Sequence, residues 1–408
     1  MAIKEFFAIP ARYRTWSLAL MGVGILSVII GFVLYGTGEH PARFWATMLQ
    51  NSVFFLLVTN AAMFFICATT LAWGGWQLSF RRVTEAVSVA VIPLGIIAGI
   101  VLLCLVLIPD IHIFHWLEPK GDKILEGKSA FLNRGFFITW TILSIGLWIV
   151  LGYKMRQLSR ELDTNPLPDA EAGRKYIFKN TVWAAVFIVW FALTVMSVTP
   201  WFWLMSIDAH WYSTMYSWYT FASSFVSGMA LITIFVVFLK NQSYLEYTNE
   251  EHIHDLGKFM FAFSIFWTYL WFSQYMLIWY ANMPEETVYF NSRITSHSHN
   301  GAYSGLYWFM FIINFLAPLL ILMRRGSKRN YTTVTFMAIL IIFGHWLDFY
   351  QMIHASLFTD HVTLNLFDFG VAAGFVGLIM FAVGRALTKA PLVAQNHPFI
   401  KESIIHHT

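Results

Sequence analysis

An imidazole and a carboxylate lie close together inside one of the most apolar parts of this sequence. In the segment GHWLDFYQMIH (residues 344–354), His345 and Asp348 are three positions apart, so on a helix both side chains would project from the same face. A histidine can exchange a proton with a carboxylate, and ionisable groups inside a membrane are rare because each costs roughly 2.5–3.5 kcal/mol to insert. The pair therefore indicates a proton-transfer site. The alternative is a hydrogen-bonded clamp that joins helices without transferring a proton.

Two further polar side chains are expected near this pair. Asp368 lies about one turn into the next apolar segment, which follows after a short loop, so it would approach the level of His345 and Asp348. Tyr275, in an earlier segment, shares a helical face with a serine and a threonine. Such hydroxyl groups can carry protons between acidic groups, or they can bond helices to one another.

Candidate groups also stand near both ends of the apolar segments. Glu85 and Asp255 lie where a proton could enter from the inner side, and the alternative for both is an ordinary charged rim. At the outer side, four residues are candidates for a proton exit, a surface that docks a partner, or plain solvated charge: Asp208, His210, Glu285 and Glu286.

The composition indicates which elements position these residues. Of the 408 residues, 58% are hydrophobic and only 12% are charged, whereas about a quarter are charged in soluble domains. Because a membrane span needs about 20 mostly apolar residues, we predict an all-α integral membrane protein with a single transmembrane domain over residues 1–408. Ten spans are expected, at residues 15–36, 45–73, 84–109, 131–153, 180–199, 211–239, 257–281, 302–323, 332–354 and 365–387.

The distribution of basic residues predicts the orientation of these spans. If both termini lie on the inner side, 20 of the 26 Lys and Arg residues fall on inner segments. Lys and Arg are enriched in cytoplasmic loops. We therefore expect a multi-pass protein whose two termini are both cytoplasmic.

The sequence offers few ligands for a metal or a redox cofactor. Cys67 and Cys104 lie inside apolar segments and no CxxCH or CxxC motif occurs, so no c-type haem or iron–sulfur cluster is expected in this chain. Haem b needs two facing axial ligands, and only His345 lies well inside a span. The SHSHN segment (residues 296–300) is a weak metal signal. We expect no metal site, and no residue is assigned to a cofactor.

Three long stretches carry a resemblance to a known family. They read WLMSIDAHWYSTMYSWYTFASSFVSGMAL (203–231), HDLGKFMFAFSIFWTYLWFSQYMLIWYANMPEETVYF (254–290) and GKSAFLNRGFF (127–137). These stretches resemble the ActF-type membrane subunit of bacterial alternative complex III, a quinol:electron-acceptor oxidoreductase. That subunit belongs to the NrfD-like (polysulfide reductase membrane-anchor) superfamily. The resemblance extends over most of the chain, and residues 203–290 are its most specific part.

The resemblance implies a fold, a location and a set of partners. The family fold has two four-helix bundles, here spans 2–5 and 6–9, and two flanking helices. The family lies in the bacterial inner membrane with a sister NrfD-like subunit, an iron–sulfur protein and multihaem cytochromes c, and a terminal oxidase is a further candidate partner. Haem c and iron–sulfur clusters would belong to these partners, and quinol is the candidate ligand. Lipids, and no nucleic acid, would surround the chain.

These observations together predict a membrane subunit of a quinol:cytochrome c oxidoreductase. It would support quinol oxidation through assembly and through proton transfer along His345, Asp348 and Asp368. One alternative is a stand-alone proton-coupled secondary transporter, although the two halves show no matching pair of broken helices. The other is a purely structural membrane anchor, in which every buried polar group holds helices together.

Overall fold

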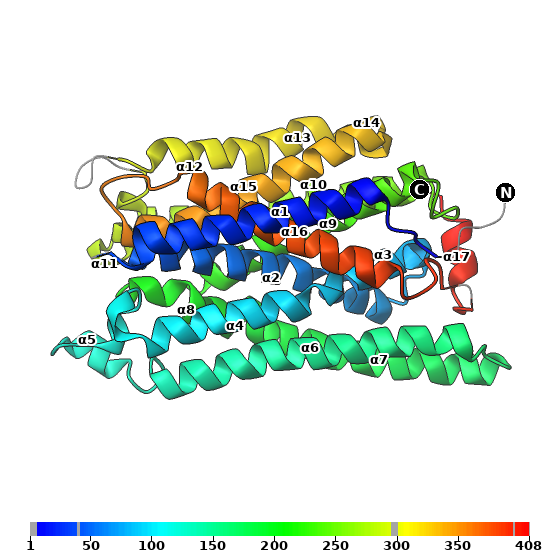
Figure 1. Cartoon of the computed structure of the whole chain (residues 1–408), viewed down its shortest axis with the longest axis horizontal. Helices are drawn as coiled ribbons and strands as arrows, with labels where there is room; N and C mark the ends of the chain where they lie inside the picture. The colour runs from blue at the N-terminus through cyan, green and yellow to red at the C-terminus, as the bar shows by residue number, and fades with distance from the viewer. Residues whose placement is uncertain (1–5, 39–40, 295–300, 395, 408) are drawn as a thin grey trace.

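The fold was examined in a computed structural model, which describes residues 6–38, 41–294, 301–394 and 396–407. These residues form helices and loops, with no strand among them. Long helices run side by side along the long axis of the molecule, and shorter helices lie at its two ends (Figure 1). Helices are expected in a bilayer, because each one satisfies its own backbone N–H and C=O groups without water. The chain is an all-α, multi-pass membrane protein.

Nine helices in the described part of the chain are long and apolar enough to cross a membrane. The nine helices include several that consist of consecutive helical elements. They are α1 (Ala11–Gly31) with η1 (Phe32–Gly36), α2 (Ala42–Leu71), α3 (Arg81–Val89) with α4 (Val91–Leu107), α6 (Arg134–Thr164), α7 (Ala170–Leu193) with η5 (Thr194–Val198) and α8 (Thr199–Trp203), α9 (Met215–Asn241), α12 (Ser304–Phe311) with η7 (Ile312–Leu316) and α13 (Ala317–Leu322), α15 (Tyr331–Leu357) and α16 (Leu366–Leu387). Each of them overlaps one expected span.

The remaining expected span, residues 257–281, lies in α10 (Glu250–Ala281), a helix of 32 residues. α10 has the length to cross a membrane, but it is not among the nine helices that are also apolar enough. The cause is its composition, since the segment FSIFWTYLWFSQY (263–275) mixes phenylalanines with tryptophans, tyrosines, serines, a threonine and a glutamine. Apolar composition therefore supports nine of the ten expected spans, and length alone supports the tenth.

Short helices lie at the two ends of this bundle. The end where α17 (Ile400–Ile404) lies is called the tail end here, and the opposite end is called the far end. α5 (Lys123–Gly127) and α11 (Pro284–Asn291) lie at the far end (Figure 1). The other short elements are η2 (Trp76–Ser79), η3 (Pro109–Ile111), η4 (His115–Leu117), η6 (Met205–Asp208) and α14 (Arg325–Arg329).

α2 and α9 form the centre of the molecule. In each of them, 83% of the most apolar stretch is buried inside the protein, compared with 17% for α1. α2 contacts α3, α4 and α7, while α9 contacts α10 and α15, and α2 and α9 also contact each other. α1 packs along α16 on the outside. Polar side chains on the inner faces of α9 and α15 are therefore shielded from lipid by neighbouring helices.

Glycines allow α1 and α16 to approach closely. A Cβ atom built on Gly374 of α16 would lie 2.6 Å from the Cα atom of Gly24 in α1, and one on Gly377 would lie 2.7 Å from the backbone nitrogen of Met21. Real Cβ atoms do not come this near to backbone atoms, so the two helices touch through their backbones. Small residues at such contacts are typical of membrane helices, which associate mainly through close packing.

We predict that Gly374→Ala destabilises the protein, because the added methyl group forces α1 and α16 apart. Overpacking of this kind costs about 1–3 kcal/mol. Thermal unfolding in detergent would measure the loss. Gly146→Ala is the matched control, because its Cβ would have no described heavy atom within 4 Å, and it should leave stability equal or slightly higher. Equal unfolding temperatures for the two variants would contradict the assigned contact.

Candidate functional site

Asp348 is the centre of a buried hydrogen-bond network in the far-end half of α15. The residue is 2% exposed. Its carboxyl group accepts hydrogen bonds from Tyr219 OH at 2.5 Å, from Trp267 Nε1 at 3.1 Å and from Ser223 Oγ at 3.3 Å. All three donors are neutral groups. Among the described residues, no lysine or arginine lies within ion-pair distance of Asp348, and its only such neighbour is His345.

His345 is fully buried beside this carboxyl group. Its Nδ1 atom lies 2.9 Å from Ser223 Oγ and 3.8 Å from Asp348 Oδ2, so the serine hydroxyl stands between the imidazole and the carboxyl group. Its Nε2 atom has no hydrogen-bond partner within the described part of the chain. The predicted shared face of His345 and Asp348 is confirmed, and Ser223 adds a hydroxyl bridge that the spacing alone did not reveal.

Three helices hold these groups in place. α9 carries Tyr219 and Ser223 four positions apart, which is about one turn, so both side chains reach α15. α10 contributes Trp267, whose ring lies against Tyr219 at 5.4 Å between centroids and edge-on to His345 at 5.2 Å. Tyr219, Ser223 and Trp267 were not predicted as site residues. The one available signal was the polar pair at this helical spacing in α9.

A small cavity adjoins Asp348. Its volume is about 10 Å³, which is room for about one water molecule. The walls come from α9, α10, α11, α12 and α15 and from Arg293 just after α11. Five buried polar atoms of the lining residues have no hydrogen-bond partner among the residues described: Trp271 Nε1, Gln274 Nε2, Arg293 Nε, Tyr307 OH and Gln351 Nε2. An unsatisfied buried polar group costs about 1–3 kcal/mol, so these atoms indicate a place for water or another small polar ligand.

Arg293 is a charged group in the cavity wall that sequence reasoning placed in an outer loop. It is 1% exposed, and its guanidinium lies 3.5 Å from the ring centroid of Tyr289. It donates to Tyr289 O at 2.8 Å, Ser292 Oγ at 3.0 Å and Ser356 Oγ at 2.9 Å. Arg293 and Asp348 thus share one cavity without forming a direct ion pair. Only the fold reveals this, because the two residues are far apart in the sequence.

Asp368 belongs to a different network. It is fully buried, and it accepts hydrogen bonds from Arg43 Nη2 at 2.5 Å and from Thr47 Oγ1 at 2.7 Å, both in α2. It also accepts from the backbone nitrogen of Asn365 and so completes the N-terminal cap of α16. No contact given for the described residues joins Asp368 to His345 or Asp348. The expected three-residue cluster is therefore a pair, because Arg43 and the helix cap hold Asp368 elsewhere.

Tyr275 lies beside the cavity and is not one of its lining residues. Its ring stacks on Trp271 at 6.4 Å and meets Phe290 edge-on at 5.3 Å. The preceding residue, Gln274, is 5% exposed and lines the cavity instead. α10 buries Trp267, Trp271 and Gln274, and it also buries the serine and the threonine of the predicted face, Ser264 and Thr268, so Tyr275 alone of that face is only half-buried.

The four outer candidates occupy separate places at the far end. Asp208 interacts electrostatically with the buried Tyr289, which also interacts with Asp348. His210 pairs with Asp122 at 3.0 Å on an exposed surface. Glu285 and Glu286 lie in the first turn of α11, where acidic side chains stabilise a helix, and Glu285 is exposed. Among the described residues, none of the four forms a hydrogen bond or an ion pair with Asp348.

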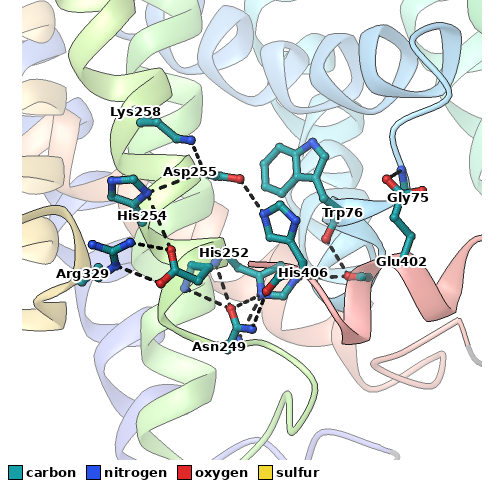
Figure 2. Close-up of polar contacts among 12 residues, drawn as sticks. Gly75, Trp76, Asn249, His252, His254, Asp255, Lys258, Arg329, Glu402 and His406 are labelled. Carbon is teal, nitrogen blue, oxygen red and sulfur yellow. Dashed lines mark hydrogen bonds and ion pairs between the residues drawn. The ribbon is translucent and has the colours of Figure 1, made fainter. Parts of the chain in front are cut away.

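At the tail end, Asp255 is held by ionisable neighbours (Figure 2). Its carboxylate lies 2.6 Å from Lys258 Nζ, 2.7 Å from His406 Nε2 and 3.8 Å from His254 Nδ1. His406 belongs to the C-terminal tail, defined here as the described residues 388–394 and 396–407, and its Ser403 and His406 contact the first turns of α10. The tail is also bonded to η2, because Ser403 Oγ donates to Trp76 O at 2.6 Å.

Glu85, the other expected entry group, lies in its own ion-pair network. It is 3% exposed and sits between Arg81 and Arg82, each at 3.1 Å. Arg82 also binds Asp163 at 2.7 Å. No ion pair or hydrogen bond given for the described residues joins this network to Asp255. The two carboxylates expected at a single proton entry are therefore held apart in two separate clusters.

The described residues contain no group of three or more His, Cys, Asp or Glu side chains that could hold a metal ion. The SHSHN segment (residues 296–300) lies outside the described residues. Cys67 and Cys104 are free thiols in α2 and α4.

Comparison with models of known protein families gave no match, and comparison with curated protein sequences gave no match either.

We predict that the tail undocks as the pH falls. Burial, together with the charges of Arg81 and Arg82, lowers the pKa of His397 from 6.5 to about 3. The docked tail thus favours neutral His397, and the undocked tail binds more protons between these pH values. The stabilisation of the docked tail by neutral His397 is complete above about pH 6.5 and is lost as the pH falls toward 3. Hydrogen–deuterium exchange of residues 396–407 would measure this, and His397→Gln should weaken the pH dependence. Protection factors of the wild-type tail that stay constant from pH 7 to 4, after correction for the intrinsic pH dependence of amide exchange, would contradict the prediction.

Proposed function

We propose that this chain is a membrane subunit of a quinol-oxidising respiratory complex of the alternative complex III type. In this proposal it lies in the bacterial inner membrane with both termini cytoplasmic, and its partners carry the haem c and iron–sulfur clusters. The resemblance of residues 203–290 supports the assignment. The helix contacts are compatible with the family fold, since α2, α4, α6 and α7 form one connected set, α9, α10, α12–α13 and α15 form another, and α1 packs on α16 outside them.

We further propose that the Asp348 centre transfers protons in the far-end half of the bundle. The supporting observation is the contrast between two buried carboxyl groups. Asp368 is fixed by Arg43, so its charge is neutralised permanently. Asp348 has only neutral donors and a histidine around it in the described structure. A carboxyl group without a fixed cation can change its protonation state when its surroundings change.

The cavity beside Asp348 supplies the next step of such a path. A water molecule there would contact the carboxyl group and the unpartnered polar atoms of Gln274, Gln351 and Tyr307. Tyr289 in the same wall lies near enough to feel the charge of Asp208, a partly exposed residue at the far end. His345 and Ser223 lie on the opposite side of the carboxyl group and can hand a proton to it.

The cavity also restricts the role of this chain. A volume of about 10 Å³ admits water and excludes a quinone ring. Asp348 and its neighbours therefore handle protons, while quinol oxidation takes place at a site that this cavity does not provide. Coupling would occur through the charge of Asp348, which responds to redox-linked changes in a neighbouring subunit.

A structural anchor is the second candidate function. It is favoured by the three hydrogen bonds that Asp348 accepts, because a carboxyl group satisfied in this way can join α9, α10 and α15 without ever releasing a proton. The two functions predict different results when the charge of Asp348 is removed and the shape of its side chain is kept.

We predict that Asp348→Asn slows proton transfer on the order of 100-fold, the lower range for loss of a general acid–base group. The amide oxygen of Asn can still accept hydrogen bonds from Trp267 and Ser223, which both reach the same carboxyl oxygen, and its NH2 group can donate to the hydroxyl oxygen of Tyr219, so the complex should still assemble. The measurement is the ratio of protons moved to electrons transferred by the purified complex in proteoliposomes.

Glu285→Gln is the control for this measurement, because it neutralises an exposed carboxylate at the same end of the protein and should leave the ratio unchanged. An assembled Asp348→Asn complex with an unchanged ratio would show that Asp348 is a clamp. Loss of assembly in Asp348→Asn, with normal assembly of the control, would also favour the structural function.

A further inference from the structure

A polar pocket at the tail end is not used by the proton path. Its walls come from the end of α2, from α7, from Arg81 at the start of α3, and from the tail through His397 and Phe399. The pocket encloses about 20 Å³, which is room for one or two groups the size of a water molecule, such as a phosphoryl oxygen. It lies where the expected membrane boundary meets the ends of the helices.

Buried polar groups in these walls have no partner within the described chain. Arg81 Nη2 and Tyr176 OH are unpaired donors, although the two residues are only 3% and 9% exposed. His397 Nδ1 accepts a hydrogen bond from the backbone of Phe399, so the neutral ring carries its proton on Nε2. Asn180 Oδ1 lacks a hydrogen-bond partner in the same pocket, and the Asn180 side chain lies near enough to Tyr176 to interact with its phenol. Two unpaired donors and one acceptor fit a ligand with an acceptor oxygen and one hydroxyl or amine.

The charges around the pocket favour an anion. The guanidinium groups of Arg81, Arg82, Arg156 and Arg160 lie around the carboxylates of Glu85 and Asp163. Positive groups therefore outnumber negative ones in this cluster. Arg81 binds Glu85 only through Nε, so its Nη2 group remains able to donate a hydrogen bond to a ligand. Arginine recognises phosphate well because of its fork of donors.

The rim of the pocket is suited to the headgroup level of a bilayer. The apolar side chains that α7 exposes beyond Tyr176, at Phe178, Val182, Val186 and Val189, lie on the side of the helix away from the pocket. Trp73, 63% exposed, stands at the rim of the pocket, and tryptophan favours the headgroup level of a bilayer. Basic pockets between membrane helices are known binding places for lipid headgroups.

We propose that this pocket binds the phosphate group of a phospholipid from the leaflet at the tail end. One phosphate oxygen accepts hydrogen bonds from Arg81 and Tyr176, and a hydroxyl or amine of the headgroup donates to Asn180 Oδ1. Because the tail contributes His397 and Phe399 to the walls, a bound lipid would also hold the tail in place. This site is independent of the role proposed for Asp348.

The test is native mass spectrometry of the purified complex during titration with phosphatidylglycerol. Wild-type protein should retain one phospholipid on this chain. Tyr176→Phe removes one donor and should weaken binding about tenfold, as expected for one hydrogen bond to a charged group. Tyr153→Phe, on an exposed face of α6, is the matched control and should bind like wild type. Equal binding by both variants would overturn the site.

Asn180→Asp provides a second variant that does not rely on the loss of a single hydroxyl. Its carboxylate can pair with Arg81 and should exclude the phosphate, so binding should fall further than in Tyr176→Phe. Excess inorganic phosphate distinguishes the source of the ligand. Failure of free phosphate to displace the lipid supports a phospholipid, whereas displacement at comparable concentration overturns the lipid assignment and assigns the pocket to free phosphate. Absence of retained lipid in wild type would overturn the proposal.

Discussion

The hydrogen bonds that converge on the Asp348 carboxyl group determine how the far-end half of this protein is built. Tyr219 and Ser223 come from α9, Trp267 comes from α10, and Asp348 itself comes from α15. A buried carboxyl group needs such partners, because leaving it unsatisfied in an apolar surrounding is costly. The three helices are therefore held in one register, and that register creates the small cavity with its ring of unpaired polar atoms.

Buried charge is held in two different ways in this protein, and Asp368 with Arg43 belongs to the paired kind. At the tail end, Glu85 and Asp255 are each bound by basic groups, and the C-terminal tail adds His406 to one of these clusters. Buried charges that are paired in this way hold a structure and resist change. At the far end, Asp348 and Arg293 line one cavity but are not paired with each other. In the proposed path, the carboxyl group that changes its protonation state is therefore the one without a paired cation.

The sequence predicted the parts of this structure that depend on local spacing. His345 and Asp348 share a face because they are three positions apart, and nine of the expected spans follow from apolar composition. The partners of Asp368 were not predictable, since Arg43 precedes it by 325 positions. The same holds for His406 and Asp255, which are 151 positions apart. α10 was expected from its length, but its inward face of tryptophans and a glutamine could be assigned only after α9 and α15 were placed against it.

The central claim is that Asp348 changes its protonation state while Asp368 does not. Redox-induced infrared difference spectroscopy of the assembled complex tests it most directly, because a protonated carboxyl group has a C=O stretching band that an ionised one lacks. The account predicts a band that appears or disappears with the redox cycle, is absent in Asp348→Asn and persists in Glu285→Gln. An identical difference spectrum in wild type and Asp348→Asn would contradict it.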